Sequence, residues 1–325
     1  MKSERVLKCM IAAGIGLMML CFAAGMKISV KIDPYEKRYV FICPLIWNNV
    51  AAGIRQADQE FAVNTKLMGS EELNVERQAD AIRESILTGV DGMITAATGE
   101  SQTLTDAVNE AVEAGIPVVM IDGDLEDSMR SCYIGTDNLE AGRMAGRDMY
   151  EVTGGTAKIA AIVSTLEAPN QKERLEGFQE EIMQYPGMEI LTIEECHSKK
   201  FEIREKVTSL LRDHSEIDAL YITEAIASDL VGNLLKEEGI APDAIHVVAF
   251  DRMDNSIAFL RQGIYDAVVS QQPYQQGYQA VKILTEINTG KKPEEKNYTE
   301  SCNITVADDE KDQTWQYGDL EWHLY

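Results

Sequence analysis

Two aspartates end apolar runs in the two halves of the chain, and their positions suit binding chemistry best. Asp122 follows the run Val-Val-Met-Ile, and Asp251 follows the run Val-Val-Ala-Phe. Each run comes one helical segment after a shorter apolar run, which begins beside Asp91 in one half and Asp218 in the other. Ligands of open parallel sheets bind beyond the carboxyl ends of the strands, and ionised carboxylates are strong hydrogen-bond acceptors. This repeat predicts two lobes of similar construction, with Asp122 and Asp251 facing a shared ligand. The alternative is that each aspartate only caps the helix after it.

The sequence shows no other set of residues with the spacing of a catalytic or metal site. Phosphate-loop, dinucleotide, zinc-protease and nucleophile-elbow motifs are absent,. The acid run 122–127 lacks the glycine position and distal glutamate of an EF-hand loop, so we interpret it as an exposed turn. The four histidines have no ligand spacing: His197, His214, His246 and His323. We therefore expect no enzymatic activity, no cofactor and no metal.

The elements that must position the two aspartates alternate between short apolar runs and amphipathic stretches. The apolar runs predict strands at 39–43, 93–96, 118–121, 132–135, 158–163, 189–193, 219–222, 246–250 and 267–270. The amphipathic stretches predict helices at 48–61, 75–87, 102–113, 171–183, 201–212, 228–238 and 274–287. This rhythm is typical of βαβ units and a parallel sheet that helices cover on both faces. The acidic stretch 297–325 is predicted only as an irregular extension.

The composition limits the class of protein. The chain has 325 residues, 45% of them hydrophobic and 26% charged, which is the balance of a folded protein with room for two domains,. Its formal net charge of -24 disfavours nucleic acid and anionic lipid as partners,. None of the six cysteines has CxxC spacing, so a zinc ribbon or a thioredoxin-type site is not expected,.

The N-terminus has the order of a targeting segment. Basic residues precede an uncharged run from Cys9 to Gly25, as in a secretory signal or a signal-anchor,. The run is at the short limit of a spanning helix, and Ala23-Ala24-Gly25 offers small residues for cleavage,. Residues 1–30 are thus expected to be a signal peptide or a membrane anchor, with the body exported.

Motifs along the body then point to a family. The run 115–122 (Gly-Ile-Pro-Val-Val-Met-Ile-Asp) is followed by 134–142 (Ile-Gly-Thr-Asp-Asn-Leu-Glu-Ala-Gly). Further on stand 174–178 (Arg-Leu-Glu-Gly-Phe), Phe250-Asp251 and 270–273 (Ser-Gln-Gln-Pro). Together these motifs resemble the type-1 periplasmic binding proteins of the ribose/galactose kind, the substrate receptors of ABC sugar importers.

The resemblance implies an α/β fold of two Rossmann-like lobes with parallel sheets, joined by three crossovers, after an N-terminal apolar helix. It covers about Tyr39 to Gly290. By this resemblance, the N-terminal lobe would hold 39–138 plus 272–298. The C-terminal lobe would hold 139–271 plus 299–325, including the tail.

The family's ligand positions fall on five residues of this sequence. Asp122 and Asp251 would accept hydrogen bonds from sugar hydroxyls, and Arg174 would donate to the ring oxygen and hydroxyls. Gln271 would touch ligand at a crossover, and Trp47 would stack on the apolar face of the sugar. The alternatives are a core position for Trp47, a surface ion pair for Arg174 and a backbone contact for Gln271.

Three departures from the family pattern concern this same site. The loop 43–47 is shorter than usual, Gly123 stands where an arginine often follows the first aspartate, and Glu224 stands where an asparagine is usual. We include Glu224 among the ligand-binding candidates, which places three acids around one arginine. Buried like charges raise one another's pKa. Hence Glu224 points away, or a proton or cation is shared, or the ligand is not an ordinary neutral sugar.

The resemblance implies an extracytoplasmic, monomeric solute-binding protein that captures a sugar or sugar-like molecule in an interlobe cleft for an ABC importer. It would be periplasmic or extracellular, or attached to the membrane through its N-terminal segment. The alternative is a ligand-sensing partner of a membrane histidine kinase or chemoreceptor. A transcriptional repressor with the same body is disfavoured by the apolar N-terminus and the net charge,.

Overall fold

The computed structural model describes residues 37–306, except 44–46, 70–73, 100 and 243. These residues belong to one compact unit that starts at Lys37. The predicted signal peptide or anchor at 1–30 and the tail beyond Val306 lie outside the described residues. Across the described ranges, none of the helices has the length and apolar character needed to span a bilayer.

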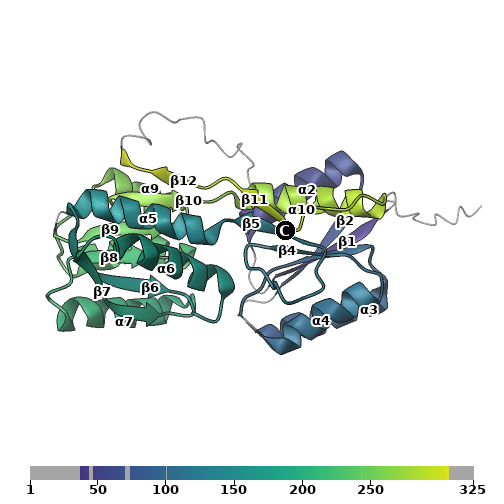
Figure 1. Ribbon diagram of the computed structural model, residues 1–325, viewed down its shortest axis with the longest axis horizontal. Helices are drawn as coiled ribbons and strands as arrows, with labels where there is room; N and C mark the ends of the chain where they lie inside the picture. The colour runs from purple at the N-terminus through teal and green to yellow at the C-terminus, as the bar shows by residue number, and fades with distance from the viewer. Residues whose placement is uncertain (1–36, 44–46, 70–73, 100, 243, 307–325) are drawn as a thin grey trace, which may run out of the picture. The chain divides into compact units, whose positions relative to one another are not determined.

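Two six-stranded sheets form the framework (Figure 1). The first contains β1 (Arg38–Cys43), β2 (Asn64–Gly69), β3 (Gly92–Thr95), β4 (Val118–Ile121), β5 (Cys132–Thr136) and β11 (Lys296–Thr299). The second contains β6 (Thr156–Val163), β7 (Gly187–Glu195), β8 (Ala219–Ile222), β9 (His246–Phe250), β10 (Ala267–Ser270) and β12 (Cys302–Ile304). Their spatial orders are β11-β5-β4-β3-β1-β2 and β12-β10-β9-β8-β6-β7. The central strands are apolar on both faces because helices cover both faces,.

Helices lie on both sides of each sheet. On the first sheet, α2 (Asn48–Phe61) and α10 (Pro273–Asn288) cover one face, and α3 (Val75–Thr88) and α4 (Gln102–Glu113) cover the other. On the second, α5 (Asn138–Thr153) and α6 (Pro169–Ile182) cover one face. The opposite face carries α7 (Lys200–Asp213), α8 (Ala225–Glu237) and α9 (Asp254–Arg261). We call the first sheet with its four helices the first lobe, and the second sheet with its five described helices the second lobe.

One helix pair in each lobe packs backbone against backbone at glycines. In the first lobe, a Cβ added to Gly53 would lie 1.9 Å from the carbonyl oxygen of Tyr274, across the contact between α2 and α10. In the second lobe, a Cβ added to Gly177 would lie 1.9 Å from the carbonyl oxygen of Leu139, between α5 and α6. Both positions therefore exclude any side chain, and α6 is held at a fixed close distance from α5.

The chain passes three times from one lobe to the other: from β5 to α5, from β10 to α10, and from β11 to β12. The first and second passages are joined by a 2.9 Å hydrogen bond from the hydroxyl of Thr136 to Oε1 of Gln271. The first and third are joined by Thr299, whose hydroxyl donates to the carbonyl oxygen of Gly135 at 3.2 Å. The predicted two-lobe α/β fold with three crossovers is confirmed. The residue limits given above for the lobes stay a prediction, which the membership of the sheets supports.

The sequence-based description of the C-terminal stretch is wrong where the structure describes it. Within the predicted stretch 297–325, residues 297–299 belong to the edge strand β11, and Cys302–Ile304 form the edge strand β12. The pair β10–β12 is antiparallel, so the second sheet is mostly rather than wholly parallel. An edge strand reached directly from a neighbouring lobe needs no helical crossover, and it can therefore run in either direction.

Candidate ligand-binding site

Asp122 and Asp251 occupy equivalent positions at the carboxyl ends of β4 and β9. Both have a left-handed backbone, with φ of 59° and 70°. Each amide donates to a carbonyl oxygen of the adjacent strand, that of Ile134 for Asp122 (3.2 Å) and that of Val269 for Asp251 (2.9 Å). Aspartate tolerates this conformation better than most residues. Two non-glycine residues strained in the same way at matching places point to a functional role.

The alternative that these aspartates cap helices is wrong. The chain after Asp122 continues through a turn to the strand β5, not into a helix. Helix α9, which follows Asp251, has Met253 at its N-cap. The carboxylates instead accept hydrogen bonds from distant side chains, Asn170 for Asp122 and Gln271 for Asp251.

Arg174 is buried at the centre of the site, with 1% of its surface exposed. Its guanidinium donates to Oδ1 of Asn138 (3.0 Å), to the carbonyl oxygen of Thr223 (2.9 Å) and to Oε1 of Gln271 (3.3 Å). Its Nη2 lies 3.8 Å from Oδ1 of Asp122, and its Cζ lies 4.5 Å from the centre of the Phe250 ring. The surface ion pair considered for Arg174 is thus excluded, and the arginine joins groups from both lobes.

Gln271 links Asp251 to Arg174 and to Thr136 where the first and second crossovers meet. Its Nε2 donates to Oδ1 of Asp251 at 2.7 Å, while its Oε1 accepts from Thr136 and Arg174. Each atom of the amide group therefore has a partner with the matching role. The backbone contact considered for Gln271 is not what the structure shows, because the side chain links a first-lobe hydroxyl to a second-lobe carboxylate.

Two asparagines belong to this network, although we did not predict them. Asn170 on the first turn of α6 donates to Oδ2 of Asp122 at 2.8 Å, and it is 7% exposed. Asn138 at the start of α5 accepts from Arg174. The spacing of Asn170 from Arg174, one helical turn, was a usable signal, since residues four apart share a helix face. Asn138 follows directly on the first crossover, and no pattern in the sequence distinguished it.

The electrostatics of the site are set by two partly buried acids and one buried arginine. Burial raises the pKa of Asp122, against the lowering effect of Arg174, and the charge of Asp251 raises it further. Burial likewise raises the pKa of Asp251, while Arg174 and the hydrogen bond from Gln271 lower it. The single guanidinium does not fully offset the desolvation of two carboxylates, so hydrogen-bond donors from a ligand would stabilise their ionised forms.

Glu224 has a role within its own lobe. It is the N-cap of α8, and its carboxylate accepts from the backbone amides of Ile226 (2.9 Å) and Ala227 (2.8 Å). The hydroxyl of Ser198 donates to the same group at 3.3 Å. Burial raises the pKa of Glu224, and the two helix amides lower it. This arrangement matches the first possibility, that Glu224 points toward its own helix; contact with a ligand stays a prediction.

Trp47 and Gly123 show how the first lobe differs from the usual pattern. Trp47 is half-buried at the start of α2, and its ring centre lies 6.3 Å from that of Phe41 in the core of the lobe. A Cβ added to Gly123 would lie 2.2 Å from the carbonyl oxygen of Ala97, so an arginine cannot replace it without moving the backbone. Stacking of Trp47 on a ligand stays a prediction.

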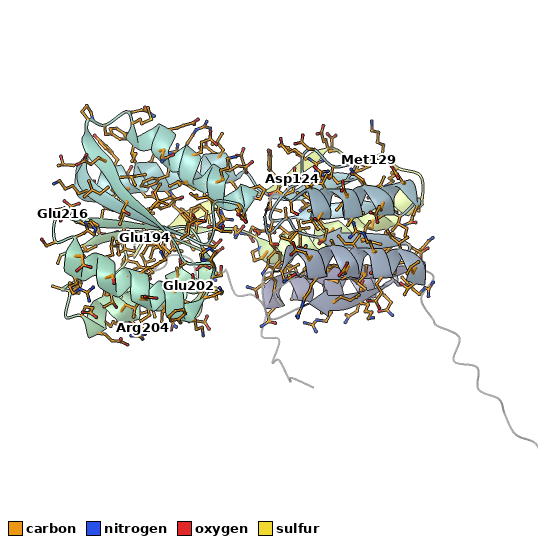
Figure 2. All side chains as sticks on the ribbon, turned by 90° about the horizontal axis from the view of Figure 1, so that it is seen from below. Asp124, Met129, Glu194, Glu202, Arg204 and Glu216 are labelled. Atoms are coloured by element: carbon orange, nitrogen blue, oxygen red, sulfur yellow. The ribbon has the colours of Figure 1, made fainter. Side chains whose placement is uncertain are left out.

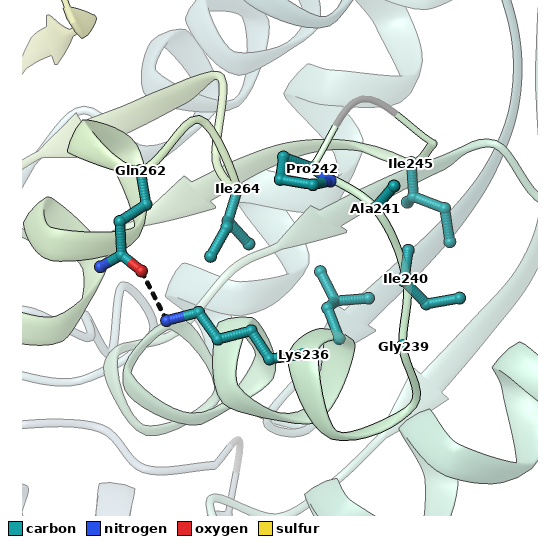
Figure 3. A pocket seen from close by; sticks show the side chains of 9 residues that line it. Lys236, Gly239, Ile240, Ala241, Pro242, Ile245, Gln262 and Ile264 are labelled. Carbon is teal, nitrogen blue, oxygen red and sulfur yellow. Dashed lines mark hydrogen bonds between the residues drawn. The ribbon is translucent and has the colours of Figure 1, made fainter.

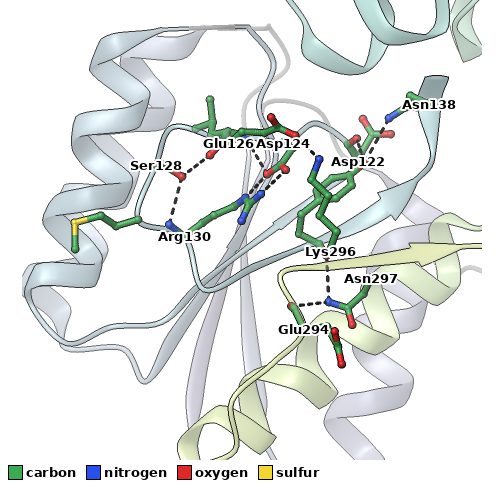
Figure 4. Close-up of polar contacts among 12 residues, drawn as sticks. Asp122, Asp124, Glu126, Ser128, Arg130, Asn138, Glu294, Lys296 and Asn297 are labelled. Atoms are coloured by element: carbon green, nitrogen blue, oxygen red, sulfur yellow. Dashed lines mark hydrogen bonds and ion pairs between the residues drawn. The ribbon is translucent and has the colours of Figure 1, made fainter. Parts of the chain in front are cut away.

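The interpretation of the acid run 122–127 as an exposed turn is wrong in part. Asp124 is buried and makes a two-pronged ion pair with Arg130, in which Nη2 donates to Oδ2 at 2.6 Å (Figure 4). Glu126 contacts Lys296, the first residue of β11. These two ion pairs stabilise the turn between β4 and β5. Among the described residues, no three histidine, cysteine or acidic side chains form a group that could hold a metal.

Many surface acids of the second lobe are neutralised locally. Around α7, Arg204 pairs with Glu237 at 2.6 Å and Lys206 pairs with Glu194 at 3.1 Å; Figure 2 labels Arg204 and Glu194. Exposed pairs of this kind add little stability.

Comparison with known proteins identifies the family. Residues 44–292 match the family model described as the periplasmic binding protein domain. The chain belongs to the periplasmic binding protein family. This periplasmic binding protein is 32% identical to GanP, a glucose-galactose binding protein from Geobacillus stearothermophilus, with a TM-score of 0.80. The match covers 84% of this chain and 98% of GanP.

Two further relatives extend the comparison. The periplasmic binding protein is 26% identical over 216 residues to the ribose import binding protein RbsB of Bacillus subtilis, which covers 66% of this chain and 69% of RbsB. The structure of a XylFII-LytSN complex matches with 28% identity and a TM-score of 0.79, over 85% of this chain and 100% of the other. The resemblance on which the sequence analysis depended is therefore confirmed.

Proposed function

We propose that this protein captures a sugar between its two lobes and presents it to an ABC importer outside the cytoplasm. The observation that carries the proposal is the pair Asp122 and Asp251, strained alike and brought together around Arg174. Two ionised acceptors and one planar donor complement a molecule that has several hydroxyls and a ring oxygen. The relatives support this ligand class, because GanP is a glucose-galactose binding protein and RbsB a ribose import binding protein.

In this proposal five of the six candidate residues have a stated role, and the sixth, Glu224, caps its own helix. Asp122 and Asp251 accept from hydroxyls, Arg174 donates to the ring oxygen, and Gln271 contacts the ligand at the crossovers. Trp47 covers the apolar C–H face of the sugar. No step of this function breaks a bond, and we propose no catalysis.

We further propose that residues 1–30 direct export and either are cleaved or anchor the body to the membrane. The support is the basic flank followed by the uncharged run,. Mass spectrometry of the protein from a native membrane fraction decides between the two, since a cleaved signal removes the apolar run from the mature mass. We expect the body to be a monomer, which light scattering after gel filtration checks.

A thermal-shift screen tests the proposed function. The panel holds hexoses, pentoses, polyols, amino sugars and nucleosides at millimolar concentration. A sugar that binds the folded state raises the melting temperature by mass action. At a concentration of a hundred times its Kd, the sugar adds about 2.7 kcal/mol to the free energy of unfolding. We expect at least one neutral sugar to do so, and to lose its effect in an Arg174→Ala variant. A panel in which only cationic amino sugars shift the protein would overturn the neutral-sugar proposal.

The likeness to XylFII supports a second candidate function. The matched structure is a complex of XylFII with LytSN, so a chain of this fold binds a second protein. In that function the sugar-loaded protein would contact a membrane sensor rather than a permease. Pull-down of candidate membrane partners with and without the sugar found in the screen separates the two, since a permease and a sensor differ in the proteins recovered.

A further inference from the structure

A pocket of about 500 Å³ opens in the second lobe, outside the proposed sugar site (Figure 3). Its walls are mostly aliphatic, and its charged lining group among the described residues is the ammonium of Lys236, which donates to Oε1 of Gln262 at 2.6 Å. The lining residues are Leu235, Lys236, Gly239, Ile240, Ala241, Pro242, Ile245, Gln262 and Ile264. The pocket therefore suits an apolar or aromatic side chain whose neighbours in its own sequence are acidic.

The pocket lies at the amino ends of the strands of the second sheet, whereas the proposed sugar site lies at their carboxyl ends. Its walls come from the residues that lead into β9 and β10, at their amino ends, and from the end of α8. Asp251 follows the carboxyl end of β9. An occupant of the pocket would therefore not compete with a ligand of the two aspartates.

The last described strand leads the chain toward this pocket. Because β12 is antiparallel to β10, Cys302 pairs with Ser270 and Ile304 pairs with Val268. β12 therefore ends beside the amino-terminal half of β10, the strand that follows Ile264 of the pocket lining. Ile304 already packs against the same apolar cluster as Leu235, Ile245 and Ile264.

The chain continues from there as 307–325, a segment rich in aromatic and acidic residues. It contains Trp315, Tyr317, Trp322 and Tyr325, together with six acids and one lysine. Trp315 is nine positions after Val306, a span of at most about 30 Å when fully extended. Among the aromatic side chains of the segment, Trp315 closes the shortest loop, which costs the least conformational entropy.

We propose that the C-terminal segment 307–325 docks on its own second lobe, with the indole of Trp315 in the pocket between Ile240 and Ile264. The indole would cover aliphatic side chains, and the acids around it would lie near Lys236. The proposal does not rest on the sugar-binding function, and it assigns the pocket to this chain rather than to a solute.

Fluorine NMR of the full chain labelled with 5-fluorotryptophan tests this proposal. The protein has three tryptophans, and the Trp315 signal is assigned with Trp315→Phe. We expect the Trp315 signal away from the position of a solvent-exposed indole, and we expect Ile240→Asp to move it there. Leu87→Asp is the matched control, because Leu87 is 88% exposed on the first lobe, and this change should leave the signal in place. A Trp315 signal at the exposed position in the unmodified protein overturns the proposal.

Hydrogen exchange provides a second measurement in case Ile240→Asp does not fold. In Trp315→Ala, amides of 235–245 and 262–265 should exchange about tenfold faster than in the unmodified protein, while those of 75–88 stay unchanged. Trp322→Ala is the control and should change neither region. Equal exchange in Trp315→Ala and the unmodified protein, or an effect of Trp322→Ala alone, contradicts the docking of Trp315. Protection that depends on protein concentration would show that the segment of a second copy fills the pocket, which also contradicts the proposal.

Discussion

The amide of Asn170 in the second lobe donates a 2.8 Å hydrogen bond to the carboxylate of Asp122 in the first. The same carboxylate lies 3.8 Å from Arg174, which is four residues further along α6. A proposed ligand-binding group of one lobe is thus already oriented by two side chains of the other. A sugar that binds here must fit around this contact or replace it.

Removing either aspartate should weaken sugar binding while leaving the fold intact. Asp122→Ala and Asp251→Ala each leave a ligand hydroxyl without its acceptor in a buried site, which costs roughly 1–3 kcal/mol, or about one to two decades in Kd. Titration calorimetry with the sugar found in the screen measures the change. If both variants bind as tightly as the unmodified protein, the site assignment is wrong, although the fold is not.

Glu224→Gln is the matched control for these two variants. Because the carboxylate of Glu224 faces the amides of α8, we expect a loss of stability of about 0.5–1 kcal/mol and an unchanged Kd,. A lower affinity would indicate a cationic ligand, and a higher affinity would indicate that the charge repels a neutral sugar.

Asn170→Asp should weaken binding of a neutral sugar about tenfold at pH 7. The change places a second carboxylate within hydrogen-bond distance of Asp122, and like charges raise each other's pKa,. Binding should recover as the pH falls and one of the two acids takes up a proton. Calorimetry at pH 7 and pH 5 checks this, with Asn170→Ala as the uncharged comparison. Tight binding by Asn170→Asp at pH 7 would exclude a role for Asn170 at the site.

The two partly buried acids of the site should make the unliganded protein less stable as the pH rises. Burial raises the folded-state pKa of Asp122 and Asp251 above the ordinary value of 3.8. Their contribution to stability is therefore fully present below pH 3.8 and is lost as the pH rises through the raised values. Each pKa unit of difference between the folded and the unfolded state changes the free energy of unfolding by about 1.4 kcal/mol. Urea unfolding from pH 4 to pH 7 should show a smaller fall in Asp122→Asn than in the unmodified protein.

Glu110→Gln provides the control of opposite sign for this experiment. The hydrogen bond from Arg83 lowers the pKa of Glu110, so its contribution is present at neutral pH and is lost as the pH falls. If the stability of Asp122→Asn and that of the unmodified protein depend on pH in the same way, the raised pKa of Asp122 does not cause the fall in stability.

Gly177→Ala should destabilise the protein and disturb the site together. The added methyl group would lie 1.9 Å from the carbonyl oxygen of Leu139, so α6 must move away from α5. Overpacking of this kind costs about 1–3 kcal/mol, and Arg174 moves with α6. Gly99→Ala is the control, because its nearest contact is an ordinary 3.7 Å. Calorimetric unfolding and sugar titration of both variants check the prediction, and equal melting temperatures would contradict it.

Ligand binding should draw the two lobes closer. A sugar that touches Asp122 and Asp251 binds the closed arrangement more tightly than the open one, and it shifts the population by that difference. Small-angle scattering should give a smaller radius of gyration at saturating sugar. An unchanged radius would count against closure.

Much of the fold could be predicted from the sequence because its central strands are buried on both faces. The strands Val118–Ile121, Ala219–Ile222 and His246–Phe250 have the bounds that their apolar runs predict. The edge strand Asn64–Gly69 escaped prediction because only Thr65 is buried and no apolar run marks it. The helix Asn138–Thr153 escaped because Gly142 and Gly146, which allow its close contact with α6, weaken its helical pattern,.

The site was harder to predict, because its geometry depends on contacts between distant parts of the chain. The repeat identified Asp122 and Asp251, and the resemblance identified Arg174 and Gln271. The direction of the Glu224 side chain could not be read from its position, since an acid after a strand can face a ligand or cap a helix equally well. The burial of Asp124 depends on Arg130, which lies across a turn and gives no periodic signal.

The two edge strands near the C-terminus set an order for folding. β11 and β12 are separated only by Glu300 and Ser301, yet they complete the sheets of different lobes. During synthesis, the first sheet cannot gain β11 until the ribosome has passed residue 299, and the second cannot gain β12 until it has passed residue 304, although domains otherwise fold from the N-terminus onward. Until then β5 and β10 keep an open edge, which is the kind of surface that recruits other strands. A chain that stops before Lys296 would therefore leave both lobes exposed to aggregation at once.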